Sequence, residues 1–345
     1  MNNHRAAGAL ALAALVSISC RATTPVLSPS AFAFATDTLR TQRVREGITH
    51  HFVYARSGPW AIHVLDVRLD QCYSPLAIKG APGAVGRTKT SDLIRDLAKS
   101  QDVVGGVNAD FFLFTPPGVL TGLHVSAGRV ITPPSRKPVF AVDSAGMPQI
   151  TVLSMPHGDS LKLDDPALGH LSLIPFHPRE AVGGRPVLVR DSVIGGEVDT
   201  EGQPSFATGR HPRTAIGIAN RGRRLLLVVV DGRQTPYSDG MTLRELATVM
   251  LALGARDALN LDGGGSTTLV YADPDSGGAL RVANRPSDAA GERPVGNALV
   301  IVKGCDATRR RHSRRVITSL YMPVTWSSSS AIRSSSSAGS AGSSA

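Results

Sequence analysis

The chain has 345 residues, of which 42% are hydrophobic and 5% aromatic, so it can fold as one large domain with an aliphatic core. Its formal net charge of +10 would suit a nucleic-acid-binding protein, but half of this excess comes from six arginines against one aspartate in residues 306–345. We therefore expect no nucleic acid as a partner. The 35 glycines and 23 prolines indicate many turns, which is typical of strand-rich folds.

The first 35 residues have the pattern of an export signal and leader. Arg5 precedes an apolar stretch over residues 6–18 that is too short to span a bilayer, and Ala-Phe-Ala sequences end at Ala33 and Ala35. We expect an exported protein, periplasmic or secreted. The alternative is a lipoprotein signal, with the chain anchored through an acylated Cys20. No later segment is apolar over the roughly 20 residues that a membrane helix needs.

The rest of the chain divides into three parts. Residues 36–59 are expected to be an N-terminal lead-in, residues 60–304 the domain, and residues 305–345 a basic, Ser-rich, disordered tail with at most weak contacts to anionic surfaces. If Cys20 leaves with the signal or is acylated, Cys72 and Cys305 remain as a pair. In an oxidising compartment they would form a disulfide joining the two ends of the domain. The alternative is two buried thiols.

The first part of the domain predicts one short helix and a series of strands. Apolar alternation and turn residues place a helix at residues 91–99 and strands at 61–69, 103–107, 123–125, 130–132, 139–142, 149–153 and 187–189. The strands between residues 119 and 153 have the turn spacing of antiparallel hairpins.

The clearest pattern covers residues 213–271. Strands at 215–219 and 225–230 precede a helix that begins with a capping box of Thr242 and Glu245, and a strand follows at 257–261. Residues 225–230 are apolar throughout, as in a strand covered on both faces. This order predicts two parallel strands joined by a right-handed crossover. The expected fold is a single α/β or α+β domain: a mixed sheet with a parallel strand–helix–strand core and antiparallel hairpins.

The two strands of this unit each end in Asp-Gly, at Asp231 and at Asp262. If the strands are neighbours, both carboxylates leave the sheet at the same edge, where α/β sites usually form. Such a pair would suit acid/base or nucleophilic chemistry. The alternative for Asp231 is a simple turn residue.

A run of three glycines, Gly263, Gly264 and Gly265, follows Asp262 and leads into Ser266, Thr267 and Thr268. Glycines let backbone N–H groups approach a ligand closely, so the run predicts an anion-binding nest, with a tight turn as the alternative. It is not a P-loop, because no lysine follows the glycines.

Further polar residues lie at other strand ends. Arg213 opens a strand, and its guanidinium either grips a phosphate or lies at the surface. Asn108 and Asp110 end another strand, just before Phe111, and Asn108 could hydrogen-bond a sugar or phosphate oxygen. No His or Cys cluster has zinc spacing, so we predict no metal site of that kind.

Several of these runs, taken together, resemble the phosphodiester glycosidase family. They are Val107-Asn-Ala-Asp-Phe-Phe, Arg213-Thr-Ala-Ile-Gly, Val230-Asp-Gly-Arg, Ala258-Leu-Asn-Leu-Asp-Gly-Gly-Gly-Ser-Thr-Thr and Arg285-Pro-Ser-Asp. The resemblance covers roughly residues 60–304 and is most specific around Asp262.

This resemblance implies an exported hydrolase that cuts a sugar-1-phosphodiester between the anomeric carbon and the phosphate oxygen, in a glycan, exopolysaccharide or glycolipid, without a cofactor. By this resemblance Asp262 is the carboxylate at the anomeric carbon, nucleophile or base, and Asp231 its acid/base partner. Arg213 clamps the phosphate and Asn108 positions the sugar. The implied substrate-binding set is Asn108, Asp110, Arg213, Thr214, Gly263, Gly264, Gly265, Ser266 and Thr267.

One residue departs from the pattern: the mammalian members have glycine at the position of Asp110. This extra carboxylate could contact sugar hydroxyls or bind a cation. Two alternatives therefore stay open. One is a metal-dependent phosphohydrolase, with Asp110, Asp231 and Asp262 holding Mg²⁺ or Ca²⁺. The other is a glycan-binding module without catalysis.

Overall fold

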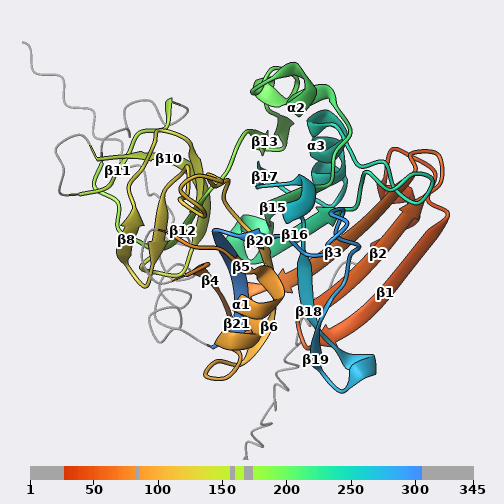
Figure 1. Ribbon diagram of the computed structural model, residues 1–345, viewed down its shortest axis with the longest axis horizontal. Helices are drawn as coiled ribbons and strands as arrows, with labels where there is room; N and C mark the ends of the chain where they lie inside the picture. Colours follow the sequence, from red (N-terminus) through yellow and green to blue (C-terminus); the bar gives the residue numbers. More distant parts are fainter. Residues whose placement is uncertain (1–26, 82–84, 156–159, 167–173, 305–345) are drawn as a thin grey trace, which may run out of the picture.

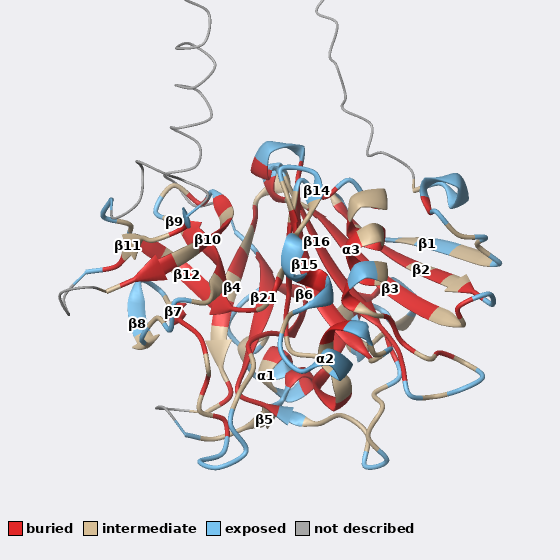
Figure 2. Cartoon of the chain, turned by 90° about the horizontal axis from the view of Figure 1, so that it is seen from above, coloured by how far each residue is buried: buried red, intermediate tan, exposed pale blue. Residues whose placement is uncertain are grey.

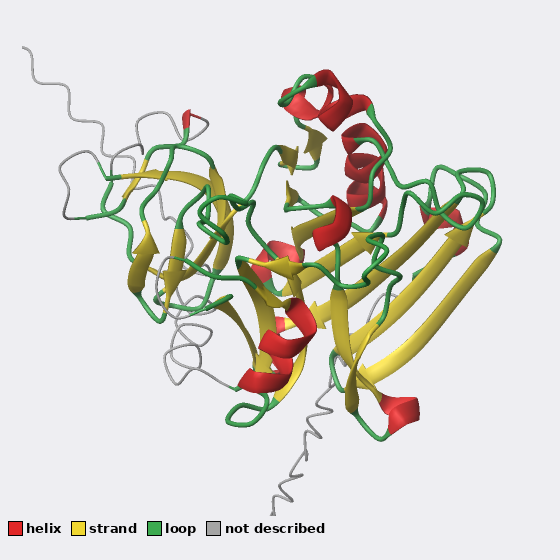
Figure 3. Ribbon diagram, viewed as in Figure 1, coloured by secondary structure: helices red, strands yellow, loops and turns green. Residues whose placement is uncertain are grey.

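Antiparallel β-sheets make up most of this molecule (Figures 1 and 3). The structure is a computed structural model, and it describes residues 27–81, 85–155, 160–166 and 174–304. The expected signal, Cys20, Cys305 and the tail lie outside these ranges. Within them, no helix has the length and apolar character needed to cross a membrane.

The largest sheet has eight strands in the order β1-β2-β3-β16-β15-β17-β13-β14. Their bounds are β1 Thr38–Arg45, β2 Ile48–Ala55, β3 Trp60–Arg68, β13 Val187–Arg190, β14 Val193–Ile194, β15 Arg213–Ala219, β16 Arg224–Val230 and β17 Asp257–Asn260. Residues 36–59, which the sequence suggested as a lead-in, contribute β1 and β2 to this sheet. All its strand pairs are antiparallel.

Two further sheets complete the body of the fold. The five-stranded sheet has the order β19-β18-β6-β21-β4, and the six-stranded sheet the order β11-β10-β9-β12-β7-β8. Their bounds are β4 Tyr73–Lys79, β6 Val103–Asn108, β7 His124–Ser126, β8 Arg129–Thr132, β9 Pro138–Asp143, β10 Pro148–Ser154, β11 Lys162–Leu163, β12 Pro178–Gly183, β18 Leu269–Asp273, β19 Ala279–Val282 and β21 Asn297–Lys303. Short strands β5 Thr88–Lys89 and β20 Pro294–Val295 form a separate pair.

One hydrophobic core joins the three larger sheets. It contains Leu65 of β3, Leu299 of β21 and Phe140 of β9, all fully buried. The five-stranded sheet lies between the other two in Figure 1, and the buried strands run through the centre of the molecule in Figure 2. The α-helices among the described residues are α1 Thr90–Leu97, α2 Pro204–Thr208 and α3 Leu243–Ala252.

The predicted parallel strand–helix–strand core is wrong. β16 and β17 are not neighbours, because β15 lies between them and pairs antiparallel with both. The apolar run of β16 has a different cause. Leu227 and Val229 face the core shared with the other sheets, whereas Leu226 and Val228 face a second core that includes α3. The run therefore reflects burial on both faces, which an antiparallel central strand can have as well as a parallel one.

The same arrangement still brings the two Asp-Gly ends to one edge. Because β16 and β17 are each antiparallel to β15, they run in the same direction and end at the same side of the sheet. Arg213, the first residue of β15, starts from that side between them. The helix between the strands begins as predicted, since Thr242 and Glu245 form the capping box.

Cys72 is in a disulfide. Its backbone carbonyl accepts a hydrogen bond from the N–H of Gly304 at 2.8 Å, so the end of the domain lies beside it. Pairing with Cys305 stays a prediction, because Cys305 is outside the described residues.

Candidate active site

The turn after β17 is fixed against the end of β6. The N–H of Asp262 donates to the carbonyl of Ala109 at 2.8 Å, and Asn108 Nδ2 donates to the carbonyl of Asp262 at 2.6 Å. The N–H of Gly264 donates to the carbonyl of Pro212 at 2.9 Å, and Gly264 has a φ of 61°. The backbone of Asp262 is thus held from two neighbouring segments.

The glycines of this turn are required by close packing. A Cβ at Gly263 would lie 2.5 Å from the carbonyl oxygen of Pro212, and one at Gly265 would overlap the side chains of Asp288 and Arg293. Asp288 and Arg293 form an ion pair, with Nε to Oδ2 at 2.7 Å. The predicted glycine run is therefore a tight turn. Three other segments pack closely against it, at Pro212, at Arg233 and at the Asp288–Arg293 pair.

Asp262 is half-buried and forms no ion pair among the described residues. Burial raises its pKa to about 6, while the nearby Ser266 hydroxyl and the charge of Arg293 act in the opposite direction. The Ser266 hydroxyl is buried but does not reach hydrogen-bonding geometry with any described group. Near neutral pH the Asp262 carboxylate is therefore mostly ionised and available to a ligand.

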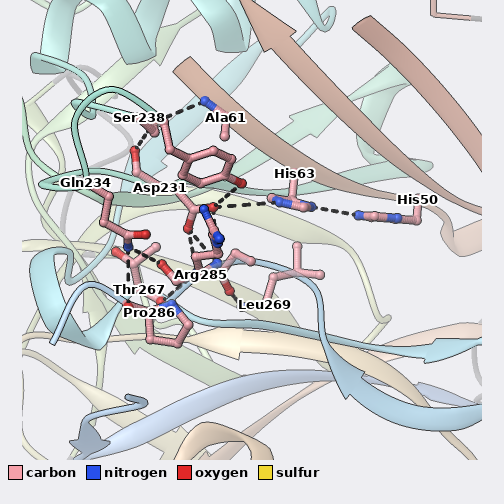
Figure 4. Close-up of polar contacts among 12 residues, drawn as sticks. His50, Ala61, His63, Asp231, Gln234, Ser238, Thr267, Leu269, Arg285 and Pro286 are labelled. Atoms are coloured by element: carbon pink, nitrogen blue, oxygen red, sulfur yellow. Dashed lines mark hydrogen bonds and ion pairs between the residues drawn. The ribbon is translucent and has the colours of Figure 1, made fainter. Parts of the chain in front are cut away.

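Asp231 is fully buried, and both of its oxygens already accept hydrogen bonds (Figure 4). Oδ1 accepts from Asn284 Nδ2 at 3.0 Å and from the N–H of Arg285 at 2.9 Å. Oδ2 accepts from the Tyr237 hydroxyl at 3.1 Å and lies 3.9 Å from His63 Nε2. Burial raises the pKa of Asp231 to about 6. A carboxylate enclosed in this way is suited to holding its neighbours in place.

Arg213 is also enclosed. Its Nε donates to the carbonyl of Met241 at 2.8 Å, and its Nη2 donates to the carbonyls of Phe206 at 2.6 Å and Gly209 at 3.0 Å. Burial lowers the pKa of this guanidinium to about 10. The side chain thereby ties the α2 segment to the strand edge, a different task from the predicted phosphate clamp.

Asn108 and Thr214 support the turn through hydrogen bonds among buried side chains and the backbone. Asn108 is fully buried, and its Oδ1 accepts from Thr214 Oγ1 at 2.8 Å and from the N–H of Thr268 at 3.1 Å. With its Nδ2 bonded to Asp262, both the oxygen and the nitrogen of the Asn108 amide have partners within the protein. Thr214 Oγ1 also lies 3.5 Å from the buried hydroxyl of Thr267.

Asp110 is buried beside the site, between two glycines. Its Oδ2 accepts a hydrogen bond from the N–H of Gly122 at 2.8 Å, and a Cβ at Gly122 or Gly183 would lie 2.8 or 2.7 Å from that oxygen. Burial raises the pKa of Asp110 to about 7, and the charge of Asp262 adds to this rise. Asp110 and Asp262 thus influence each other electrostatically.

The Mg²⁺ or Ca²⁺ alternative requires Asp110, Asp231 and Asp262 to converge on one ion. No group of three or more His, Cys, Asp or Glu among the described residues is arranged to hold a metal. The oxygens of Asp231 instead accept hydrogen bonds from Asn284, Arg285 and Tyr237.

Two exposed arginines near the turn were missed as site residues. Arg233 follows Asp231 by two positions, and its Nη1 would lie 3.2 Å from a Cβ at Gly264. Its Nη2 lies 3.4 Å from His211 Nδ1. Arg285 is held by Asp231 through its backbone N–H. Within the described ranges, neither arginine forms an ion pair with a carboxylate. Arg233 lies in the run Val230-Asp-Gly-Arg, which was the available signal.

Comparison with known structures supports this fold. A protein of unassigned function from Synechocystis is similar with a TM-score of 0.56 and 18% identity, over 77% of this chain and 64% of that one. The zebrafish N-acetylglucosamine-1-phosphodiester alpha-N-acetylglucosaminidase catalytic domain, auto-inhibited by its pro-peptide, has a TM-score of 0.53 and 22% identity, over 76% and 81%. A candidate exported protein from Burkholderia pseudomallei K96243 has a TM-score of 0.51 and 20% identity, over 71% and 74%.

At the level of sequence, we find no curated protein that matches the chain. The model of the phosphodiester glycosidase family, however, matches residues 101–302. This range is more than half of the chain, and it contains Asn108, Arg213, Asp231 and the turn that follows Asp262. The chain therefore belongs to the phosphodiester glycosidase family.

Proposed function

We propose that this protein hydrolyses a sugar-1-phosphodiester by breaking the bond between the anomeric carbon and the phosphate oxygen. The observation that carries the proposal is Asp262, a half-buried carboxylate without an ion-pair partner among the described residues, on a turn fixed by Asn108 and Ala109. Of the other two predicted carboxylates, Asp110 is buried and accepts a hydrogen bond from Gly122, and Asp231 is enclosed by hydrogen bonds.

The proposed reaction needs little general-acid catalysis. When the bond to the anomeric carbon breaks, its electron pair leaves on a phosphate oxygen, and a phosphomonoester is a weak base that needs little protonation. The positive charge that develops on the sugar ring needs a nearby carboxylate. Asp262 would supply it, as nucleophile or as the base that takes a proton from the attacking water. Asp231 would act by keeping its partners Asn284, Arg285 and Tyr237 in place.

In this proposal Arg233 binds the phosphate, in place of the predicted Arg213. The guanidinium of Arg213 is bonded to backbone carbonyls, whereas that of Arg233 is exposed beside Gly264. A guanidinium matches two phosphate oxygens with parallel N–H donors.

We also propose that the protein acts outside the cytoplasm, on a glycan, exopolysaccharide or glycolipid. The disulfide at Cys72 supports an oxidising compartment. The signal-like residues 1–35 and the similarity to a candidate exported protein agree with it.

The test is hydrolysis by the full chain of 1-phosphodiesters of N-acetylglucosamine, N-acetylgalactosamine and glucose, with and without EDTA. We expect free sugar and an intact phosphomonoester, with the same rate in EDTA. The Asp262→Asn variant should lose at least about 100-fold in kcat. Asp275→Asn, at an exposed position on a distant turn, is the matched control and should keep full activity.

Other products would overturn the proposal. Release of sugar-1-phosphate would move the cut to the phosphorus side, and loss of activity in EDTA would restore the metal-dependent alternative. Binding without turnover, equal in Asp262→Asn and the unmodified protein, would indicate a glycan-binding module.

A further inference from the structure

We propose that Arg285 is a second phosphate-binding residue and that Asp231 is the positioning residue that presents it. This inference rests on the proposed function, because the phosphate is that of the phosphodiester substrate. It assigns a task to a buried carboxylate that cannot itself reach a ligand.

The backbone of Arg285 is held on its donor and acceptor sides. Its N–H donates to both oxygens of Asp231, at 2.9 and 3.1 Å, and its carbonyl accepts from Gln234 Nε2 at 2.9 Å (Figure 4). The preceding residue, Asn284, is buried and donates through Nδ2 to Asp231 and to the carbonyl of Thr267, each at 3.0 Å. The last of these bonds joins the segment to the turn that carries Asp262.

The side chain of Arg285 rests on an aromatic ring. Its guanidinium carbon lies 4.4 Å from the centre of the Tyr237 ring, and the hydroxyl of that ring donates to Asp231 Oδ2. Stacking on a ring occupies one face of a guanidinium and leaves its in-plane N–H donors available. Arg285 is exposed and has no carboxylate partner among the described residues. It is therefore a pre-oriented cation without an ion pair, whose charge acts on Asp231 and lowers the pKa of that carboxyl.

Asp231 is linked to both exposed arginines. Arg233 follows it in sequence, Arg285 is hydrogen-bonded to it, and Gln234 links the two segments. Burying a carboxylate costs free energy unless its hydrogen bonds are satisfied, and here the satisfying donors include the backbone of Arg285. Guanidiniums without ion pairs, here Arg233 beside Gly264 and Arg285 on the Tyr237 ring, are suitable recognition elements for phosphate.

The first experiment titrates the full chain with inorganic phosphate by calorimetry at constant ionic strength. We expect Arg285→Ala to weaken phosphate binding about tenfold, as for loss of a charge-assisted hydrogen bond. Arg233→Ala should weaken it at least as much. Arg40→Ala, which removes an exposed arginine from the edge strand β1, is the control and should change nothing. Arg285→Ala binding phosphate as well as Arg40→Ala would overturn the proposal, and so would absence of phosphate binding by the unmodified protein.

The positioning role has its own test, because a purely structural role for Asp231 would not depend on Arg285. Asp231→Asn should weaken phosphate binding in the unmodified background and have no further effect in the Arg285→Ala background. If Asp231→Asn does not fold, Tyr237→Ala, which removes the supporting ring, should show the same dependence. Additive effects in the double variants would contradict the assignment.

Phosphate binding is measured without turnover, so the two proposals fail separately. A protein that binds phosphate through Arg285 but hydrolyses no diester would leave this assignment standing and remove the proposed reaction.

Discussion

At the scale of single residues, the ionisation of Asp262 sets the expected pH dependence. Burial raises its pKa to about 6, so the carboxylate form needed at the anomeric carbon is lost as the pH falls through that value. We expect kcat/KM to rise about tenfold per pH unit below pH 6 and to level off above it. A pH–rate profile of the full chain between pH 4.5 and 8 measures this. A profile without an inflection near pH 6 would contradict the role of Asp262.

The sequence located the glycine turn that follows Asp262, because the signal is contiguous and mostly concerns the backbone, while the predicted anion-binding nest stays a prediction. It could not show how Asp231 and Arg213 are used. Their side chains are directed by Asn284 and Met241, which are distant in the sequence, and residue type alone does not distinguish a free carboxylate or guanidinium from an enclosed one. Arg285 opens the run Arg285-Pro-Ser-Asp that carries part of the resemblance, but its support by Tyr237 exists only in the folded chain.

At the scale of elements, the turn after β17 should tolerate no side chain at Gly263. A Cβ there would lie 2.5 Å from the carbonyl oxygen of Pro212, so the two segments would have to separate. We expect Gly263→Ala to destabilise the protein by about 1–3 kcal/mol. We also expect its activity to fall by more than the fraction of unfolded protein accounts for. Gly196→Ala is the control, because a Cβ at Gly196 meets nothing within 4 Å. The melting temperature and kcat of both variants test this prediction. Equal values for Gly263→Ala and Gly196→Ala would show that the turn accommodates a side chain.

Local signals also explain which elements could be predicted. The capping box at Thr242 and the strands β3, β6, β15 and β16 follow from residues close in sequence. The order of strands in the sheet does not. An apolar run such as 225–230 reports burial on both faces but not the direction of its neighbours, so the insertion of β15 between β16 and β17 could not be foreseen.

At the scale of the whole molecule, the β1–β2 hairpin is part of the sheet that carries the site. Val53 of β2 is fully buried, and β2 pairs with β3 along its whole length. We expect a chain beginning at residue 36 to unfold cooperatively like the full protein. A chain beginning at residue 60 would expose the edge of β3 and should show no cooperative transition. Circular dichroism during heating compares the two, and a folded chain from residue 60 would establish the hairpin as dispensable.

The position of β15 also bears on how the protein folds. β15 and β16 form a hairpin across the short turn Asn220–Gly222, and β17 then adds to the free side of β15 after α3. The strand edge that carries Arg213, Asp231 and Asp262 is therefore assembled from one continuous segment, closed by a short turn between β15 and β16 and by residues 231–256, which include α3, between β16 and β17. Contacts of this kind form faster than pairings between distant parts of a chain. In pulse-labelling hydrogen exchange, amides of β15 and β16 should gain protection before those at the pairing of β21 with β4, whose partners are more than 200 residues apart.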